Sequence, residues 1–420
     1  MKFATLCLAS LFCSYTSAFT SSIRSNNGVS LINKNVNKFG VRRWMSSEIA
    51  VPPTTEVEMS SEFEAVRDAT LEQLKGQLNA VNAKPELISG LVHFVNEYFG
   101  ALSMANAQGN EDITPEFVAK QIVSAIQYGM AYGTGEDKYT FGVQHRAQRD
   151  YEGNDFYKFG CNFFRPAMDL ENSPFVGKEN LDEAMDFIKQ GHNVVFFANH
   201  QSEADPQVVS CMLEKCGYSQ EASEIYFVAG HKVTTDTLAI PFSMGRNLIC
   251  IHSKKHLDAD MDTKPVKQKQ NLMAMTSMLK LLRDPDQGCM IWVAPSGGRD
   301  RRDLTTNQVP IAPFDQKTID MFRLMGNKSK QPMHYYSMSM ISYDLCPPPD
   351  FVEVGTGEQR NVRFVPVGLT VSKELENKGG VETRHLFTEH AEEECQLGYQ
   401  ALLEAMDTSS SSSVPEKPQN

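Results

Sequence analysis

His200 and Asp205, five residues apart, are the first pair of side chains in the sequence with an obvious capacity for chemistry. A neutral imidazole can take a proton from an alcohol, and a carboxylate on its other nitrogen fixes the tautomer and stabilises the imidazolium. A plainer interpretation is that Asp205 only caps a helix and that His200 makes a local hydrogen bond. The spacing alone leaves both interpretations open.

The segments on either side of the pair predict its position in a fold. Residues 194–197 are four consecutive large apolar residues, which predict a strand buried on both faces. Asp205-Pro206 predicts a helix start, with aspartate at the N-cap and proline at the first helical position. His200 would then lie at the carboxyl end of a buried strand, where ligands bind in open α/β sheets. The helix N-terminus would favour the charged carboxylate that the catalytic interpretation needs.

Three other apolar stretches, 248–251, 290–294 and 309–315, are predicted strands that end in polar loops. The first is followed by His252-Ser253-Lys254-Lys255-His256, and the second by Pro295-Ser296-Gly297-Gly298-Arg299-Asp300-Arg301-Arg302. Cations at a strand end, beside glycines that let the backbone approach closely, suit a phosphate. The alternative is a solvated basic surface, so a phosphate site is a hypothesis here.

From residue 151 onwards, apolar strands alternate with helical stretches, which predicts an α/β domain. We expect a mixed, largely parallel central sheet flanked by helices and preceded by a small N-terminal helical bundle. Further strand candidates are 225–230, 335–342 and 362–371, and an amphipathic helix is expected over 270–282.

The expected organisation has six parts. Residues 1–18 are typical of a signal peptide, and the acid-free, basic and serine-rich stretch 19–47 is typical of a plastid transit segment. The helical bundle is expected over 56–132, with helices starting near Ser61, Pro85 and Thr114, and a linker over 133–150. The α/β domain would cover 151–407, and the serine-rich tail 408–420 is expected to be disordered.

Composition excludes several classes of protein. The net charge of −12 argues against a general nucleic-acid binder. The nine cysteines form no C-x-x-C pair, which is typical of a reducing compartment. Beyond the extreme N-terminus, no apolar run is long enough to predict a transmembrane helix.

The block from Asn199 to Pro206 resembles the first block of the glycerolipid acyltransferases. More specifically, the chain is similar to the soluble, plastid glycerol-3-phosphate acyltransferases from about Phe156 through Pro349. The blocks that carry this resemblance are Pro241-Phe242-Ser243-Met244-Gly245-Arg246-Asn247-Leu248, Ser253-Lys254-Lys255-His256 and Pro295-Ser296-Gly297-Gly298-Arg299-Asp300-Arg301.

This resemblance implies roles for six residues. His200 would be the catalytic base and Asp205 its partner, and the substrate phosphate would bind to Lys255, His256, Arg299 and Arg301. The sequence departs from the family after Gly230, where His231-Lys232 replaces an acidic and then a basic residue.

Four alternatives compete with this interpretation. A metal site would use His252 and His256, but no H-E-x-x-H and no third ligand accompany them. A serine hydrolase would use Ser296, which is not in a G-x-S-x-G turn. Acylation of lysophosphatidate is chemically related, and a catalytically dead acyl-carrier-binding module is the non-enzymatic alternative. A turnover assay would separate all four.

The resemblance, together with the composition of the first 47 residues, therefore implies a glycerol-3-phosphate 1-O-acyltransferase of the plastid stroma, which we expect to be a monomer with no cofactor and no metal. The acyl donor would be an acyl carrier protein or coenzyme A thioester, and the protein could lie peripherally at a membrane. An acidic carrier needs a local basic surface on this acidic chain. Lys264, Lys267 and Lys269 are the candidates, with Arg302 as a possible addition, and the alternative is that these lysines are only a solvated helix start.

Overall fold

The computed structural model describes residues 58–80, 84–252, 257, 261–348, 359–378 and 381–412. The predicted signal peptide and transit segment lie outside these residues. From Met59 onwards, the described residues form one compact unit.

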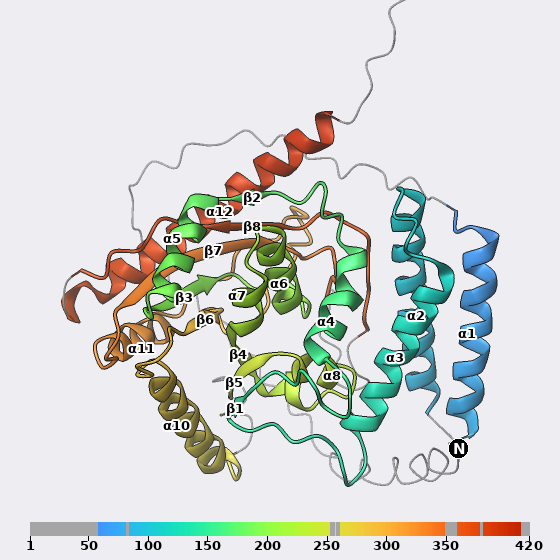
Figure 1. The fold of residues 1–420 in the computed structure, drawn as a ribbon, viewed down its shortest axis with the longest axis horizontal. Helices are drawn as coiled ribbons and strands as arrows, with labels where there is room; N and C mark the ends of the chain where they lie inside the picture. Colours follow the sequence, from blue (N-terminus) through green and yellow to red (C-terminus); the bar gives the residue numbers. More distant parts are fainter. Residues whose placement is uncertain are drawn as a thin grey trace, which may run out of the picture. The chain divides into compact units, whose positions relative to one another are not determined.

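Three N-terminal helices begin where the sequence predicts them: α1 (Ser61–Ala80), α2 (Pro85–Ala107) and α3 (Pro115–Gly133). The side chain of Thr114 accepts a hydrogen bond from Phe117 N at 3.2 Å, and Pro115 opens α3 because it has no N–H to leave unpaired. The three helices pack on one another beside the α/β part (Figure 1).

The bundle shares its core with α4 (Phe156–Phe164). The Tyr98 ring stacks on Phe163 with centroids 4.3 Å apart, and its hydroxyl donates to Phe163 O at 2.9 Å. The division of the chain into bundle, linker and catalytic domain stays a prediction.

An eight-stranded sheet forms the centre of the α/β part, in the order β1-β5-β4-β6-β3-β7-β8-β2. The five central strands, β5-β4-β6-β3-β7, are parallel to one another. On either side of them, β1 pairs antiparallel with β5, and β8 pairs antiparallel with β7. The predicted mixed, largely parallel sheet is thereby confirmed. The strands are β1 (Gln144–His145), β2 (Phe175–Val176), β3 (Asn193–Ala198), β4 (Tyr226–Gly230), β5 (Asn247–Ile251), β6 (Met290–Val293), β7 (Met333–Ile341) and β8 (Gly368–Val371).

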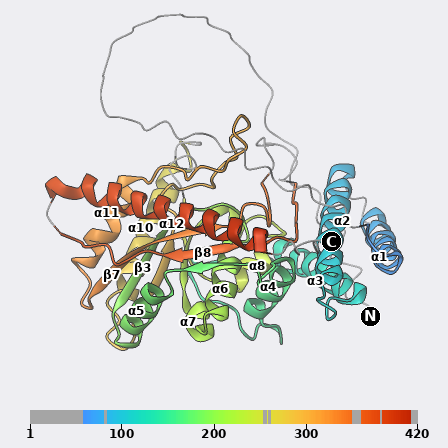
Figure 2. The same cartoon turned by 90° about the horizontal axis from the view of Figure 1, so that it is seen from above.

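Helices cover both faces of the sheet (Figure 2). One layer contains α10 (Lys264–Leu281), α11 (Gln316–Gly326) and α12 (Arg384–Ser412), and the other contains α5 (Lys178–Lys189), α6 (Asp205–Lys215) and α7 (Ser219–Glu224). Strand β3 is buried throughout, with Phe196 in the core on one face and Phe197 in the core on the other. The predicted doubly buried strand is confirmed, and it lies between β6 and β7.

Shorter elements complete the described chain: α8 (Ile240–Met244), η1 (Arg165–Ala167), η2 (His231–Thr234) and η3 (Val381–Thr383).

Several predicted boundaries are wrong. Residues 309–315 form no strand, because Pro310 and Pro313 cannot donate to a ladder, and only Gly368–Val371 of the stretch 362–371 is a strand. Helix α10 begins six residues early, at Lys264-Pro265, and its only buried side chains are those of Ala274 and Met278. It therefore lacks the strongly amphipathic character expected of it.

The tail also differs from the prediction, because α12 continues through residues 408–412. A helix that is already formed gains one backbone hydrogen bond for each residue it adds, so a serine-rich stretch can extend it. Residues 413–420 lie outside the described part.

Candidate active site

His200 and Asp205 form a direct hydrogen-bonded pair just beyond the carboxyl end of β3. The distance from His200 Nδ1 to Asp205 Oδ2 is 2.6 Å. The Asp205 side chain is completely buried, whereas 27% of the His200 side chain is exposed. With Nδ1 bound to the carboxylate, Nε2 is the ring nitrogen that can accept a proton from an alcohol.

The sequence predicts Asp205 at the N-cap of α6, and this prediction is wrong. Ala204 is at the N-cap, and Asp205 is the first helical residue. Its carboxylate turns back to the preceding loop, where it accepts hydrogen bonds from Gln201 N at 2.8 Å and from Ser202 N and Oγ at 3.0 Å. Ser342 Oγ, at the end of β7, donates to it at 2.6 Å. The carboxylate thus holds residues 200–202 of the loop around itself and orients the imidazole.

The two neighbours of His200 fix its loop to β7. Asn199 Oδ1 accepts from Met340 N at 2.8 Å, and Asn199 Nδ2 donates to Met340 O at 3.0 Å. Gln201 Oε1 accepts from Ser342 N at 2.9 Å, and Gln201 Nε2 donates to Tyr399 Oη of α12 at 3.2 Å. His200 is therefore held between two anchored side chains.

Strand β6 and the loop that follows it, which we call the β6 loop, support His200 from the other side. The Trp292 ring lies edge-on to the imidazole with centroids 5.9 Å apart, and Asp300 N donates to His200 O at 2.6 Å. The Asp300 carboxylate accepts from Ala312 N at 2.9 Å and from Asn199 Nδ2 at 3.1 Å. Burial raises the pKa of this carboxyl to about 6 in spite of these hydrogen bonds.

Cations gather around Glu203, three residues after His200. Arg299 NH1 lies 3.7 Å and Lys232 Nζ 3.9 Å from Glu203 Oε1, and Arg360 Nε lies 3.4 Å from Oε2. Arg360 NH2 also lies 2.8 Å from Asp236 Oδ1. Arg299 and the positively charged Lys232 thus come together beside the histidine loop.

The other predicted site residues are less closely gathered. Lys255 and His256 lie outside the described residues. Arg301 is exposed on the β6 loop, and Lys264, Lys267 and Lys269 lie in the first turns of α10. Arg302 binds Asp344 Oδ1 at 2.6 Å and Asn307 O at 3.0 Å, so it braces the loop.

Within the described ranges, no group of three or more His, Cys, Asp and Glu residues is arranged to hold a metal ion. His252 Nε2 lies 2.6 Å from Gln270 Oε1. None of the described helices has both the length and the apolar character to cross a membrane.

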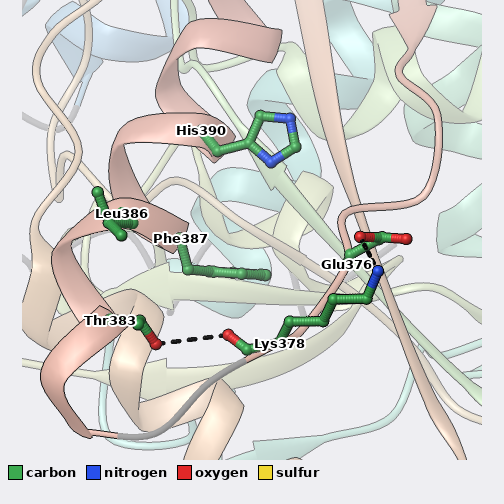
Figure 3. Close-up of a pocket in the computed structure, with 6 residues that line it drawn as sticks. All are labelled: Glu376, Lys378, Thr383, Leu386, Phe387 and His390. Atoms are coloured by element: carbon green, nitrogen blue, oxygen red, sulfur yellow. Dashed lines mark hydrogen bonds and ion pairs between the residues drawn. The ribbon is translucent and has the colours of Figure 1, made fainter.

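Two surface hollows lie among the helices of one layer. The smaller, of about 200 Å³, is at the start of α12 and is lined by Glu376, Lys378, Thr383, Leu386, Phe387 and His390 (Figure 3). The larger, of about 440 Å³, lies between α10 and α11 and is lined by Leu272, Met275 and Met321 among others. Neither is lined by a residue of the His200 site.

Sequence reasoning missed the residues that support the pair. Asn199 and Gln201 alternate with His200, and this alternation of amides could have indicated anchoring side chains. Ser342, Tyr399 and Arg360 come from distant segments and carry no local signal.

The comparisons with known proteins give the class to which the chain belongs. A family model described as Acyltransferase matches residues 175–336, which include His200, Asp205 and Arg299. This places the chain in the acyltransferase class.

The comparisons with individual proteins are more specific. The chain is 45% identical over 242 residues to the chloroplastic glycerol-3-phosphate acyltransferase of Arabidopsis thaliana, covering 57% of this chain and 51% of that protein. It is 32% identical over 343 residues to the protein of that name from Carthamus tinctorius, covering 79% of this chain and 72% of that protein. The chain belongs to the family of chloroplastic glycerol-3-phosphate acyltransferases.

The chain spans about half the length of the relatives with the highest identity. Among solved structures, it is similar to the 1-acyl-sn-glycerophosphate acyltransferase of Thermotoga maritima, with 17% identity and a TM-score of 0.35 over 59% of this chain and 78% of that one.

Proposed function

We propose that this protein transfers a fatty acyl group from an acyl thioester to the sn-1 hydroxyl of glycerol 3-phosphate. The observation that carries the proposal is the 2.6 Å bond between His200 Nδ1 and the buried Asp205 carboxylate. His200 Nε2 takes the hydroxyl proton as the oxygen attacks the thioester carbonyl. The tetrahedral intermediate collapses, the leaving thiolate takes the proton from the His200 imidazolium, and 1-acyl-glycerol 3-phosphate and the free thiol form. Asp205 stabilises the imidazolium and keeps the ring in position.

The phosphate would bind to Lys255, His256, Arg299 and Arg301. Support comes from Arg299, whose side chain is 13% exposed and which precedes Asp300, the residue that binds the His200 carbonyl. A partly buried guanidinium in this position can hold a phosphate through charge-assisted hydrogen bonds.

The donor and the location are part of the same proposal. The donor would be an acyl carrier protein or coenzyme A thioester, and the protein would act in the plastid stroma, as a monomer. The plastid location is supported by the names of the relatives, which are chloroplastic. A carrier would dock at Lys264, Lys267 and Lys269 of α10.

Replacing His200 tests the mechanism. His200→Ala should lower turnover by about 10²–10⁴, the usual contribution of a positioned general base, and leave the fold intact. His390→Ala, which removes a half-exposed histidine of α12, is the control. Initial rates are measured with glycerol 3-phosphate, dihydroxyacetone phosphate and lysophosphatidate as acceptors. A folded His200→Ala protein with a near-normal rate would exclude this mechanism. A preference of the unmodified protein for lysophosphatidate would exclude glycerol 3-phosphate as the natural acceptor.

Replacing the arginines tests the phosphate site. Arg299→Ala and Arg301→Ala should each raise the KM for glycerol 3-phosphate roughly ten- to a hundred-fold, because a hydrogen bond to a charged group contributes about 1.5–3 kcal/mol. The KM for the acyl donor should hardly change. Arg283→Ala, which removes an exposed arginine bound to Lys328 O, is the control. A rise in the donor KM instead would assign these arginines to a different site.

A further inference from the structure

Glu203 is the centre of a charged cluster assembled from four separate segments. Lys232 follows β4, Arg299 follows β6 and Arg360 precedes β8, and each has a charged nitrogen within 4 Å of the Glu203 carboxylate. Asp236 contributes a second carboxylate through its 2.8 Å contact with Arg360. We call these five residues the Glu203 cluster.

The distances show that the Glu203 carboxylate is shared. Its contacts with the three cations measure 3.4–3.9 Å, whereas a tight charge-assisted hydrogen bond measures about 2.7–2.9 Å. Three cationic side chains from separate segments thus converge on one carboxylate, and none of them holds it at the distance of a tight hydrogen bond. Such convergence suits an anion with more oxygen atoms than one carboxylate has.

Partial burial strengthens this preference. The side chain of Arg360 is 21% exposed and that of Arg299 is 13% exposed, so water screens their charges less than on an open surface. Both are arginines, whose planar guanidinium can give two parallel hydrogen bonds to a phosphate.

The cluster is built on the two segments that hold the proposed base. Glu203 is in the His200–Asp205 loop, and Arg299 is next to Asp300, whose N–H binds the His200 carbonyl at 2.6 Å. An anion bound here would lie beside the histidine loop.

We propose that Arg360 is a further phosphate-binding residue and that Glu203 is an internal anion, which holds the cations together until a phosphate displaces it. The proposal rests on the proposed function for the identity of the natural phosphate ester. Binding of inorganic phosphate can nevertheless be measured without turnover.

Calorimetric titration of the full chain with inorganic phosphate tests Arg360. Arg360→Ala should weaken phosphate binding at least about ten-fold, and Arg360→Lys should recover part of the loss because it restores the charge without the planar fork. Arg363→Ala is the matched control, since Arg363 lies three residues away, is 55% exposed and pairs with Asp344. Unchanged phosphate affinity in Arg360→Ala would overturn the assignment, as would an equal loss in Arg363→Ala.

Glu203→Gln tests the internal anion. The substitution keeps the shape of the side chain and removes the competing charge, so phosphate should bind more tightly, by several-fold. Weaker binding would overturn this part of the proposal.

The same titration separates this proposal from the proposed function. His200→Ala should bind phosphate like the unmodified protein while failing to transfer acyl groups. If no acyl transfer is found with any donor, but phosphate affinity still depends on Arg360, the proposed reaction fails and the phosphate site stands. If acyl transfer is normal in Arg360→Ala and the KM for glycerol 3-phosphate is unchanged, the reaction stands and Arg360 has no part in it.

Discussion

Asp205 accepts five hydrogen bonds from four residues while its side chain is completely buried. Such a number of donors offsets the cost of removing a carboxylate from water, and it leaves the group little freedom to turn. Because His200 Nδ1 is hydrogen-bonded to this carboxylate, the orientation of the imidazole ring is fixed as well. The site is thus a carboxylate held in place by its donors, and this carboxylate in turn orients the proposed base, His200.

Asp300 gives a pH-dependent test of the same loop. Burial raises the pKa of its carboxyl from 3.8 to about 6, so between these values the folded state retains a proton that the unfolded state releases. Stability should therefore fall as the pH rises from about 4 to 6, by about 2–3 kcal/mol for a shift of this size. Asp300→Asn removes this titration.

The measurement is urea unfolding of both proteins between pH 4 and 7. Titrations of other groups cancel in the difference between the two proteins. Relative to Asp300→Asn, the unmodified protein should lose stability over this pH range. A difference that stays constant with pH would contradict the raised pKa.

The sequence predicted the pair and missed its environment. Because His200 and Asp205 are close in the chain, their residue types and spacing were enough to suggest the contact. The contacts of Ser342, Tyr399 and Arg360 depend on chain reversals over more than a hundred residues, and no local pattern encodes such a reversal. The N-cap prediction for Asp205 failed because the carboxylate binds the loop before the helix instead of the helix itself.

Among the elements, long apolar runs were the most reliable guide. Four consecutive apolar residues were enough to predict strand β3. The pattern is reliable because a strand between two parallel neighbours is covered on both faces and is therefore apolar on both. Helix α10 was predicted too short and too amphipathic, since Val266, Leu272 and Met273 are exposed on it. Apolar residues predict burial only where another element is available to cover them.

The contact between α8 and α4 depends on a residue without a side chain. A Cβ on Gly245, which follows α8, would lie 2.2 Å from Phe156 O and 2.5 Å from Phe156 C. Gly245→Ala should therefore push the start of α4 away and lower the free energy of unfolding by about 1–3 kcal/mol, the usual cost of overpacking. Chemical denaturation measures it, with Gly76→Ala of α1 as control, since a Cβ there meets nothing within 4 Å. A Gly245→Ala protein as stable as the unmodified protein would show that the contact is not tight, whereas Gly76→Ala should be slightly more stable than the unmodified protein because alanine favours a helix more than glycine does.

At the scale of the whole molecule, the charge of α10 contrasts with that of the chain. The chain has a net charge of −12, yet α10 has four lysines and no acidic residue. Lys264 is at the helix N-terminus, where the helix dipole disfavours a cation, so intrahelical energetics do not explain its position. A local basic surface of this kind can attract an acidic partner despite the mean charge.

Reversal of Lys264, Lys267 and Lys269 to glutamate should therefore raise the KM for an acyl-carrier donor, most strongly at low salt, where charges are screened least. The KM for acyl-coenzyme A should change less. The matched control reverses Lys75, Lys84 and Lys120, which are exposed on or next to the N-terminal helices and give the same change in net charge. Steady-state kinetics at two ionic strengths measure the effect. If both triple variants lose carrier affinity equally, net charge and not a docking surface is responsible.

The anchoring of the His200 loop to β7 and α12 has a consequence for the order in which the protein matures. Asp205 receives one of its hydrogen bonds from a residue 137 positions further on, and Gln201 receives one contact from a residue 198 positions further on. A chain made from its N-terminus carries His200 long before these partners exist, and until then the loop has only its local bonds from residues 200–202 to Asp205. The full set of contacts around His200 therefore forms only after Tyr399 has been synthesised and α12 has docked.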